Sequence, residues 1–226
     1  GARTEADLRA VAAEVSALGA KALVVPTDVL DFDQLQRLAD SAMAEFGRID
    51  ILVNNAGGSP PKPVSQTSSR EFEMALRFNV TTAFEMSRIC APLMVDSADG
   101  GNILNISSIA GHKPAPCFAA YGTAKGALSY LTRELAQEFA PRVRVNAIAV
   151  GSTRTDALNT VLTDEIEQTM VELTPMARLG EVEDIALGAL YLCSNAASYV
   201  TGDILCVNGG MERLNMQMPR AWGGSG

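Results

Sequence analysis

The sequence of 226 residues has few of the features that mark disulfide-linked, metal-binding or secreted proteins. It contains one histidine and four cysteines, which lie far apart and form no CxxC pair. His112 completes no metal-ligand set with them, so we expect no metal site. We interpret Cys90, Cys117, Cys193 and Cys206 as reduced core residues of a cytoplasmic protein.

Basic charge and long apolar runs are also scarce. Lys and Arg total 18 against 26 Asp and Glu, a net charge of −8 at pH 7. This balance argues against nucleic acid or an anionic membrane surface as a partner. The longest apolar stretches, such as residues 22–25 and 51–53, are far too short to span a membrane. The chain starts GARTEADL, without the basic and then apolar pattern of a signal peptide.

Short apolar runs alternate with amphipathic helical patterns along the chain, which has no low-complexity linker and no internal repeat. We therefore expect a single domain over residues 1–226. Short strands that are apolar on both sides, separated by helices, predict an α/β fold with a doubly wound parallel sheet of the Rossmann type, covered on both faces. Strands are expected at residues 22–25, 49–53, 103–106, 143–150 and 204–207, and helices at 6–18, 31–47, 69–94, 121–139, 156–173 and 182–193. The second of these helices should open with a capping box formed by Asp31 and Gln34.

Polar and small residues directly follow the expected strands. In an open parallel sheet the ligand lies beyond the carboxyl ends of the strands. The residues at those positions are Asp28, Asn54-Asn55-Ala56-Gly57, Ser107-Ser108 and Gly151.

Tyr121 and Lys125 lie four residues apart, on one face of an expected helix. A tyrosine has an ordinary pKa of about 10, and a nearby cation lowers that pKa by favouring the phenolate. An isolated pair of this kind is more often part of a half-exposed helix surface than a catalytic pair. Ser108, thirteen positions earlier, can donate to a carbonyl oxygen that Tyr121 also contacts. Asn79 is a poor helix former inside a long helix, which suggests a hydrogen-bonding task.

The ordered set of motifs resembles the short-chain dehydrogenase/reductase family. The matching elements run from about Arg3 to Gly210: Asp28-Val29 after a strand, NNAG at 54–57, Asn79, the serine of ISS at 108, YxxxK at 121–125, and Gly151 with Thr155. The resemblance implies an NAD(P)-dependent oxidoreductase that interconverts a ketone and a secondary alcohol by hydride transfer.

The resemblance also implies a role for each catalytic residue. Tyr121 would be the general acid in ketone reduction and the base in alcohol oxidation. Lys125 would lower the pKa of Tyr121 and bind the nicotinamide ribose. Ser108 would orient and polarise the substrate carbonyl. Asn79 would hold a water that links Lys125 to solvent.

Five further residues would bind the cofactor on the same grounds. Asp28 and Val29 would contact the adenine, Asn55 the cofactor's backbone side, and Thr153 and Thr155 the nicotinamide amide.

Arg3 would lie beside the adenosine 2′ position. A guanidinium there favours a 2′-phosphate, so we expect NADP(H), with NAD(H) as the second possibility and a solvated arginine as the alternative interpretation of Arg3.

Two features depart from the family pattern. No glycine-rich turn of the TGxxxGxG kind, which would bind the pyrophosphate, occurs in the 226 residues. A strand–helix–strand unit takes about 30 residues or more, and we expect one to precede Gly1 in the natural protein. Val150 stands where the family usually has proline, and we regard this difference as minor.

Residues 156–176 alternate apolar and acidic positions, and we expect them to form a lid over the substrate rather than a plain surface helix pair. The resemblance implies a homotetramer that packs through the helices at 69–94 and 121–139.

A 3-oxoacyl thioester reductase is one possible function within the family, because VNGGM at 207–211 looks similar to such members. A steroid or small-ketone dehydrogenase fits equally well. The competing class is a non-catalytic truncated paralogue that serves as an oligomer subunit.

Overall fold

The protein is built around a four-stranded parallel sheet in the order β1-β2-β3-β4. The computed structural model describes residues 1–160, 162–216 and 218. The strands are β1 (Ile51–Asn54), β2 (Gly101–Ser108), β3 (Val143–Val150) and β4 (Ile204–Val207). Their carboxyl ends lie in register, with Asn54 opposite Asn105 and Ser108 opposite Val150, which in turn pairs with Val207. The expected α/β fold with a Rossmann-like parallel sheet is confirmed.

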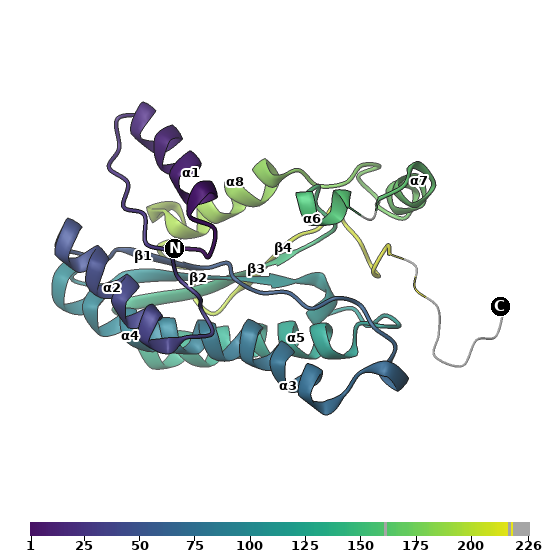
Figure 1. The fold of residues 1–226 in the computed structure, drawn as a ribbon, viewed down its shortest axis with the longest axis horizontal. Helices are drawn as coiled ribbons and strands as arrows, with labels where there is room; N and C mark the ends of the chain where they lie inside the picture. The colour runs from purple at the N-terminus through teal and green to yellow at the C-terminus, as the bar shows by residue number, and fades with distance from the viewer. Residues whose placement is uncertain (161, 217, 219–226) are drawn as a thin grey trace.

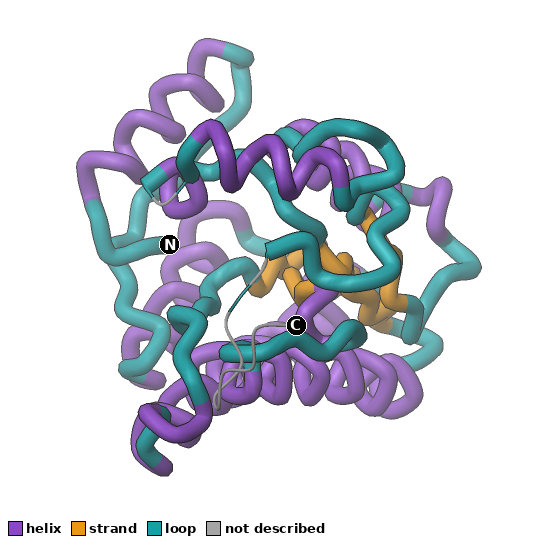
Figure 2. Tube along the Cα trace, turned by 90° about the vertical axis from the view of Figure 1, so that its right-hand side faces the viewer, coloured by secondary structure: helices purple, strands orange, loops and turns teal. Residues whose placement is uncertain are grey.

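Helices lie on both sides of the sheet (Figure 1). One face carries α2 (Phe32–Phe46), α3 (Ser69–Leu76), α4 (Thr82–Ala98) and α5 (Ala119–Phe139), while α1 (Glu5–Ala17) and α8 (Val182–Cys193) lie on the other. The short helices α6 (Asp156–Asn159) and α7 (Asp164–Glu172) lie at one end of the molecule, and the end view in Figure 2 shows helices and loops around the strands. Single turns occur at η1 (Val64–Gln66), η3 (Ile109–Gly111) and η4 (Asn195–Ala197).

Apolar side chains form one core on each face of the sheet. The larger core joins β2 and β3 to α2, α4 and α5 through Leu35, Met94, Ile103 and Val145, all buried. The smaller core packs Leu104 and Ile148 against Leu192 of α8 and Ala197. Burial of such side chains stabilises a fold by roughly 1.5–3 kcal/mol each. The two cores hold β2 and β3 rigidly, and these strands carry the site.

Helix α2 begins and ends where the sequence predicts. The Asp31 carboxylate accepts hydrogen bonds from the backbone N–H groups of Asp33 and Gln34, and the Gln34 side chain donates back to it. Gly47 ends the helix at φ 74°, a left-handed conformation that glycine adopts without strain.

The strand expected at residues 22–25 is not formed, so this prediction is wrong. Its residues are exposed or half-buried, and among the described residues the only pairing nearby is an isolated bridge between Ala2 and Pro26. A parallel strand exists only through hydrogen bonds to a neighbour, which an apolar run cannot reveal. The edge strand β1 is also less covered by helices than expected. The side chains of Ile51 and Val53 in this strand remain 47% and 48% exposed.

The helix expected over residues 69–94 is interrupted. A π-helical segment, η2 (Arg77–Thr81), separates α3 from α4 and contains Asn79. Such segments are rare and are frequent at functional sites. The region 156–173 similarly forms two short helices, α6 and α7, instead of one.

None of the four cysteines forms a disulfide bond, but only two of them are core residues. Cys90 and Cys117 are buried, Cys193 is half-buried and Cys206 is exposed, which corrects the expectation of four core cysteines. Among the described residues, no helix is long and apolar enough to cross a membrane. The described residues also contain no cluster of three His, Cys, Asp or Glu side chains suited to a metal ion.

Candidate active site

The structure brings Ser108, Tyr121 and Lys125 together at the carboxyl end of β2. Tyr121 and Lys125 lie one turn apart on α5, and the Lys125 Nζ lies 5.8 Å from the centroid of the Tyr121 ring. Ser108, the last residue of β2, forms a side-chain hydrogen bond with Tyr121. The Ser108 Oγ also accepts a hydrogen bond from the backbone N–H of Ala110 at 3.2 Å. These contacts fix the serine hydroxyl against the phenol.

The pKa of Tyr121 differs from the expectation. Burial raises the pKa of the phenol above its usual value, and the hydrogen bond from Ser108 opposes that rise. The Lys125 ammonium group donates to the carbonyl oxygen of Ile106 at 2.7 Å, and burial lowers the pKa of Lys125 to about 8. Desolvation therefore disfavours the charged form of each of the two groups.

Asn79 joins the site through the loop after β1. Its side chain is fully buried; Nδ2 donates to the carbonyl oxygens of Gly58 and Ala75, and Oδ1 accepts from the N–H of Gly58 at 2.8 Å. A Cβ atom at Gly57 would lie 2.6 Å from Oδ1 of Asn79 and 2.9 Å from Nζ of Lys125. The backbone at Gly57 thus passes between Asn79 and Lys125, where no larger residue fits.

A glycine contact that sequence reasoning missed sets the position of Ser108 relative to Tyr121. Gly111, which ends η3 directly after Ser108, packs against Gly126 of α5. A Cβ atom at Gly111 would lie 2.6 Å from the backbone N of Gly126 and 2.6 Å from the backbone C of Lys125. The signal in the sequence is the glycine that follows YGTAK, at position 126.

A pocket of about 1060 Å³ opens beside Tyr121. Its walls come from the loop at Gly58–Pro61, from Phe118, and from the region of α6 and α7. Apolar side chains dominate the far wall, among them Ile166, Met170 and Met216. The segment 156–176, which the sequence predicts to be a lid, contributes Leu158, Ile166 and Met170 to this pocket, and its Val161 falls outside the described residues.

Asn215 is a second residue that the sequence did not reveal. Its side chain is fully buried and lines the same pocket. Its Oδ1 accepts from the Ser152 hydroxyl at 2.5 Å, while Nδ2 donates to the Met170 carbonyl at 3.1 Å and to the Thr174 hydroxyl at 3.0 Å. This amide ties α7 to the loop after β3 over a long sequence separation, which no local pattern signals.

Three of the expected cofactor residues lie together. Arg3, Asp28 and Val29 line one cavity of about 200 Å³ near the amino end of the chain. Arg3 is exposed in that cavity. Asn55 is exposed directly after β1, separate from this group.

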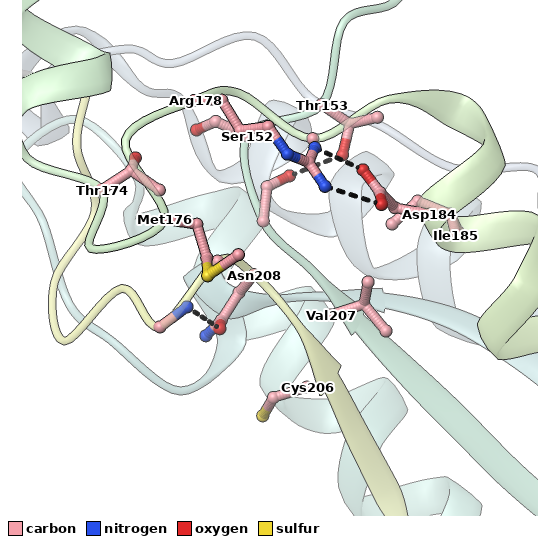
Figure 3. A pocket seen from close by; sticks show the side chains of 14 residues that line it. Ser152, Thr153, Thr174, Met176, Arg178, Asp184, Ile185, Cys206, Val207 and Asn208 are labelled. Carbon is pink, nitrogen blue, oxygen red and sulfur yellow. Dashed lines mark hydrogen bonds and ion pairs between the residues drawn. The ribbon is translucent and has the colours of Figure 1, made fainter.

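Thr153 and Thr155 follow β3 but face different surroundings. Thr153 is buried and lines a separate cavity of about 300 Å³ between the end of β4 and the start of α8 (Figure 3). In this cavity Arg178 and Asp184 form an ion pair at 2.6 Å. The Thr155 hydroxyl instead accepts a hydrogen bond from the N–H of Leu158 at 3.3 Å.

Comparison with known proteins gives the family. A family model described as Enoyl-(Acyl carrier protein) reductase matches residues 2–212. The chain belongs to the short-chain dehydrogenase/reductase family. The members of this family are NAD(P)-dependent oxidoreductases that act on CH–OH and C=O groups, and the expectation drawn from the sequence motifs is confirmed.

The short-chain dehydrogenase is similar to longer proteins. It is 44% identical over 218 residues to an uncharacterized oxidoreductase of Mycobacterium tuberculosis, covering 96% of this chain and 83% of the relative. It is 43% identical over 204 residues to the 7alpha-hydroxysteroid dehydrogenase of Escherichia coli K12, covering 89% of this chain and 79% of the relative. A solved 7alpha-hydroxysteroid dehydrogenase, complexed with NADH and 7-oxo glycochenodeoxycholic acid, superposes with a TM-score of 0.87 at 42% identity, covering 91% and 80% of the two chains.

The residues present fit two parts of a nicotinamide cofactor. Lys125 is 4% exposed and has three N–H donors, of which one donates to Ile106 in the described structure. The other two can serve ribose hydroxyls beside the open backbone at Gly57. At the other end, the cavity of Arg3, Asp28 and Val29 offers a guanidinium and a carboxylate for an adenosine. The 226 residues contain no glycine-rich turn for the pyrophosphate between them.

Proposed function

We propose that the protein transfers a hydride between NADP(H) and a ketone or secondary alcohol, with Tyr121 as the general acid and base. The observation that supports this most directly is the hydrogen bond between Ser108 and Tyr121 at the edge of a large apolar pocket. The nicotinamide cofactor would supply the hydride, since no side chain can do so.

We assign the following roles to the protein residues by their resemblance to the family. Ser108 orients the substrate oxygen toward the phenol, and Tyr121 gives that oxygen a proton during reduction. The phenol of Tyr121, whose pKa is raised by burial, carries the proton that reduction requires. Lys125 binds the cofactor ribose, and Asn79 holds a water that links Lys125 to solvent. Asp28 and Val29 contact the adenine, Asn55 the cofactor's backbone side, and Thr153 and Thr155 the amide.

Arg3 supports NADP(H) over NAD(H), because it shares a cavity with Asp28 and Val29. A guanidinium binds a phosphate through charge-assisted hydrogen bonds and gains nothing comparable from a free hydroxyl. We expect Arg3→Glu to reverse the ratio of kcat/KM for NADPH over NADH. A ratio unchanged by Arg3→Glu would refute the assignment.

Tyr121→Phe tests the proposed reaction. The variant keeps the aromatic ring but loses the transferable proton, so we expect turnover to fall by at least ~10³-fold while cofactor binding persists. Tyr199→Phe, at a fully exposed tyrosine, is the control and should leave turnover unchanged. Retained turnover in Tyr121→Phe would exclude the proposed mechanism.

The assembly and location are part of the same proposal. Phe84 of α4 and Tyr130 of α5 expose aromatic rings, which supports a homotetramer packed through these helices. None of the four cysteines forms a disulfide bond, which supports a cytoplasmic location. Residues 156–176 act as the substrate lid, since α7 supplies one wall of the pocket.

A 3-oxoacyl thioester reductase is the second candidate, supported by the sequence VNGGM at residues 207–211. The non-catalytic subunit is the third, supported by the lack of a glycine-rich turn in the sequence. Failure of the chain to bind either nicotinamide cofactor would favour the non-catalytic subunit.

A further inference from the structure

The pocket beside Tyr121 carries charge of one sign. Among the described residues that line it, Glu165 of α7 is the one acidic residue, and no lysine, arginine or histidine lines it. Its remaining walls are apolar or uncharged, and include Met170, Met216 and Met218. A substrate that reaches Tyr121 therefore has the Glu165 carboxylate on one wall and thioethers on the others.

The Glu165 carboxylate is not neutralised by a described partner. It is exposed, and no described basic group forms an ion pair with it, whereas the nearby Glu167 pairs with Arg154. The field at this wall is therefore negative, in a chain with a net charge of −8.

The size and polarity of the pocket further restrict the kinds of ligand that it can bind. A pocket of about 1060 Å³ lies at the upper end of the range for small-molecule sites, so it has room for a bulky apolar body. Methionine side chains are flexible and polarizable, and they pack against apolar ligands of irregular shape. An anionic substrate would have to leave water for a site whose described lining residues offer it no cationic side chain.

We infer that the substrate is a bulky apolar ketone or alcohol without an anionic group, and that Glu165 is the residue that discriminates against anions. This inference rests on the proposed function, since it takes the pocket beside Tyr121 as the substrate site.

The test uses three ketones built on one acetylbiphenyl frame, bearing a methyl ester, a carboxylate or a trimethylammonium group. Dissociation constants are measured by calorimetry at low salt on the full chain and on Glu165→Gln, Glu165→Lys and Asp164→Asn. We expect the carboxylate ketone to bind wild type at least ~5-fold more weakly than the other two. Glu165→Gln should strengthen the carboxylate ketone and weaken the trimethylammonium ketone, by ~5-fold each. Glu165→Lys should reverse the order of these two.

Asp164→Asn removes the same charge from the neighbouring residue, which is not among the pocket-lining residues, and should change these constants by less than ~2-fold. Equal binding of the three ketones, equal effects of Asp164→Asn and Glu165→Gln, or no binding of any ketone would overturn the inference. Reduction of the bound ketones with NADPH or NADH is scored separately. Binding in the expected order without reduction by either cofactor would instead overturn the proposed function and leave the charge preference of the pocket in place.

Discussion

At the scale of single residues, the site is governed by desolvation. Burial raises the pKa of Tyr121 and lowers that of Lys125, so each group disfavours its own charged form. The hydrogen bond from Ser108 is the one contact that lowers the pKa of Tyr121. The pKa of Tyr121 therefore depends on the hydroxyl group of Ser108 as well as on burial.

Removal of that hydroxyl should shift the pH dependence of catalysis. In Ser108→Ala the pKa of Tyr121 rises further, so the rise of alcohol oxidation with pH moves to higher pH. Ketone reduction should fall by ~10²-fold, since a donor to the developing charge is lost. Profiles of kcat/KM against pH provide the measurement. Ser107→Ala is the control, because Ser107 bonds to Ser129 and to the Lys125 carbonyl, not to Tyr121. An unshifted oxidation profile in Ser108→Ala would contradict this account.

Lys125 should make the stability of the fold depend on pH. Its pKa is about 8 in the folded chain against an ordinary value near 10.5, so between these pH values the unfolded chain binds more protons. Stability from this group therefore rises with pH through that window, by on the order of 3 kcal/mol. The free energy of unfolding of wild type relative to Lys125→Met should increase by this amount from pH 7 to 10.5. Lys21→Met, at an exposed lysine, should show no such trend. Urea titrations measure the difference, and parallel curves for wild type and Lys125→Met would refute the assignment.

At the scale of elements, the site depends on how closely η3 approaches α5. The contact of Gly111 with Gly126 sets the distance between Ser108, just before η3, and Tyr121, in the first turn of α5. A side chain at Gly111 would push the two elements apart, because the obstacle is backbone and cannot rotate away.

Gly111→Ala should therefore lower kcat by ~10- to 100-fold and destabilise the fold by about 1–3 kcal/mol. Gly188→Ala, in the middle of α8, is the matched control; its Cβ would lie 3.2 Å from the Val207 side chain, which can yield. Turnover and thermal unfolding of the two variants give the comparison. Wild-type turnover in Gly111→Ala would show that this contact does not position the site.

A comparison of the predicted and observed helices and strands shows which parts of the fold the sequence predicts. Residues 143–150, 182–193 and 204–207 form the expected strand, helix and strand, because their patterns are strong and their neighbours lie in the same chain. Residues 22–25 have an equally strong pattern but lack a partner strand among the described residues. The π-helical segment at Asn79 and the Asn215 side chain, buried in the pocket wall, depend on packing between distant residues. The motifs predicted a set of residues, of which Ser108, Tyr121 and Lys125 lie together in the structure, whereas packing set their pKa values and the pocket walls.

At the scale of the whole molecule, aromatic rings remain exposed on α4 and α5, at Phe84 and Tyr130. A tetramer would bury them. We expect sedimentation at about four times the monomer mass, and Tyr130→Asp should weaken the assembly by at least ~10-fold. Val11→Asp, at an exposed apolar residue of α1 on the other side of the sheet, is the control. A wild-type protein that sediments only as a monomer would contradict the tetramer.

The central claim is that this chain moves a hydride from a nicotinamide cofactor to a ketone with Tyr121 as the acid. The most direct measurement supplies NADPH dideuterated at C4 of the nicotinamide, together with the uncharged acetylbiphenyl ester, and analyses the alcohol by mass spectrometry. The account predicts one deuterium at the carbinol carbon with wild type and no alcohol with Tyr121→Phe. An alcohol without deuterium, or deuterated alcohol from both proteins alike, would contradict it.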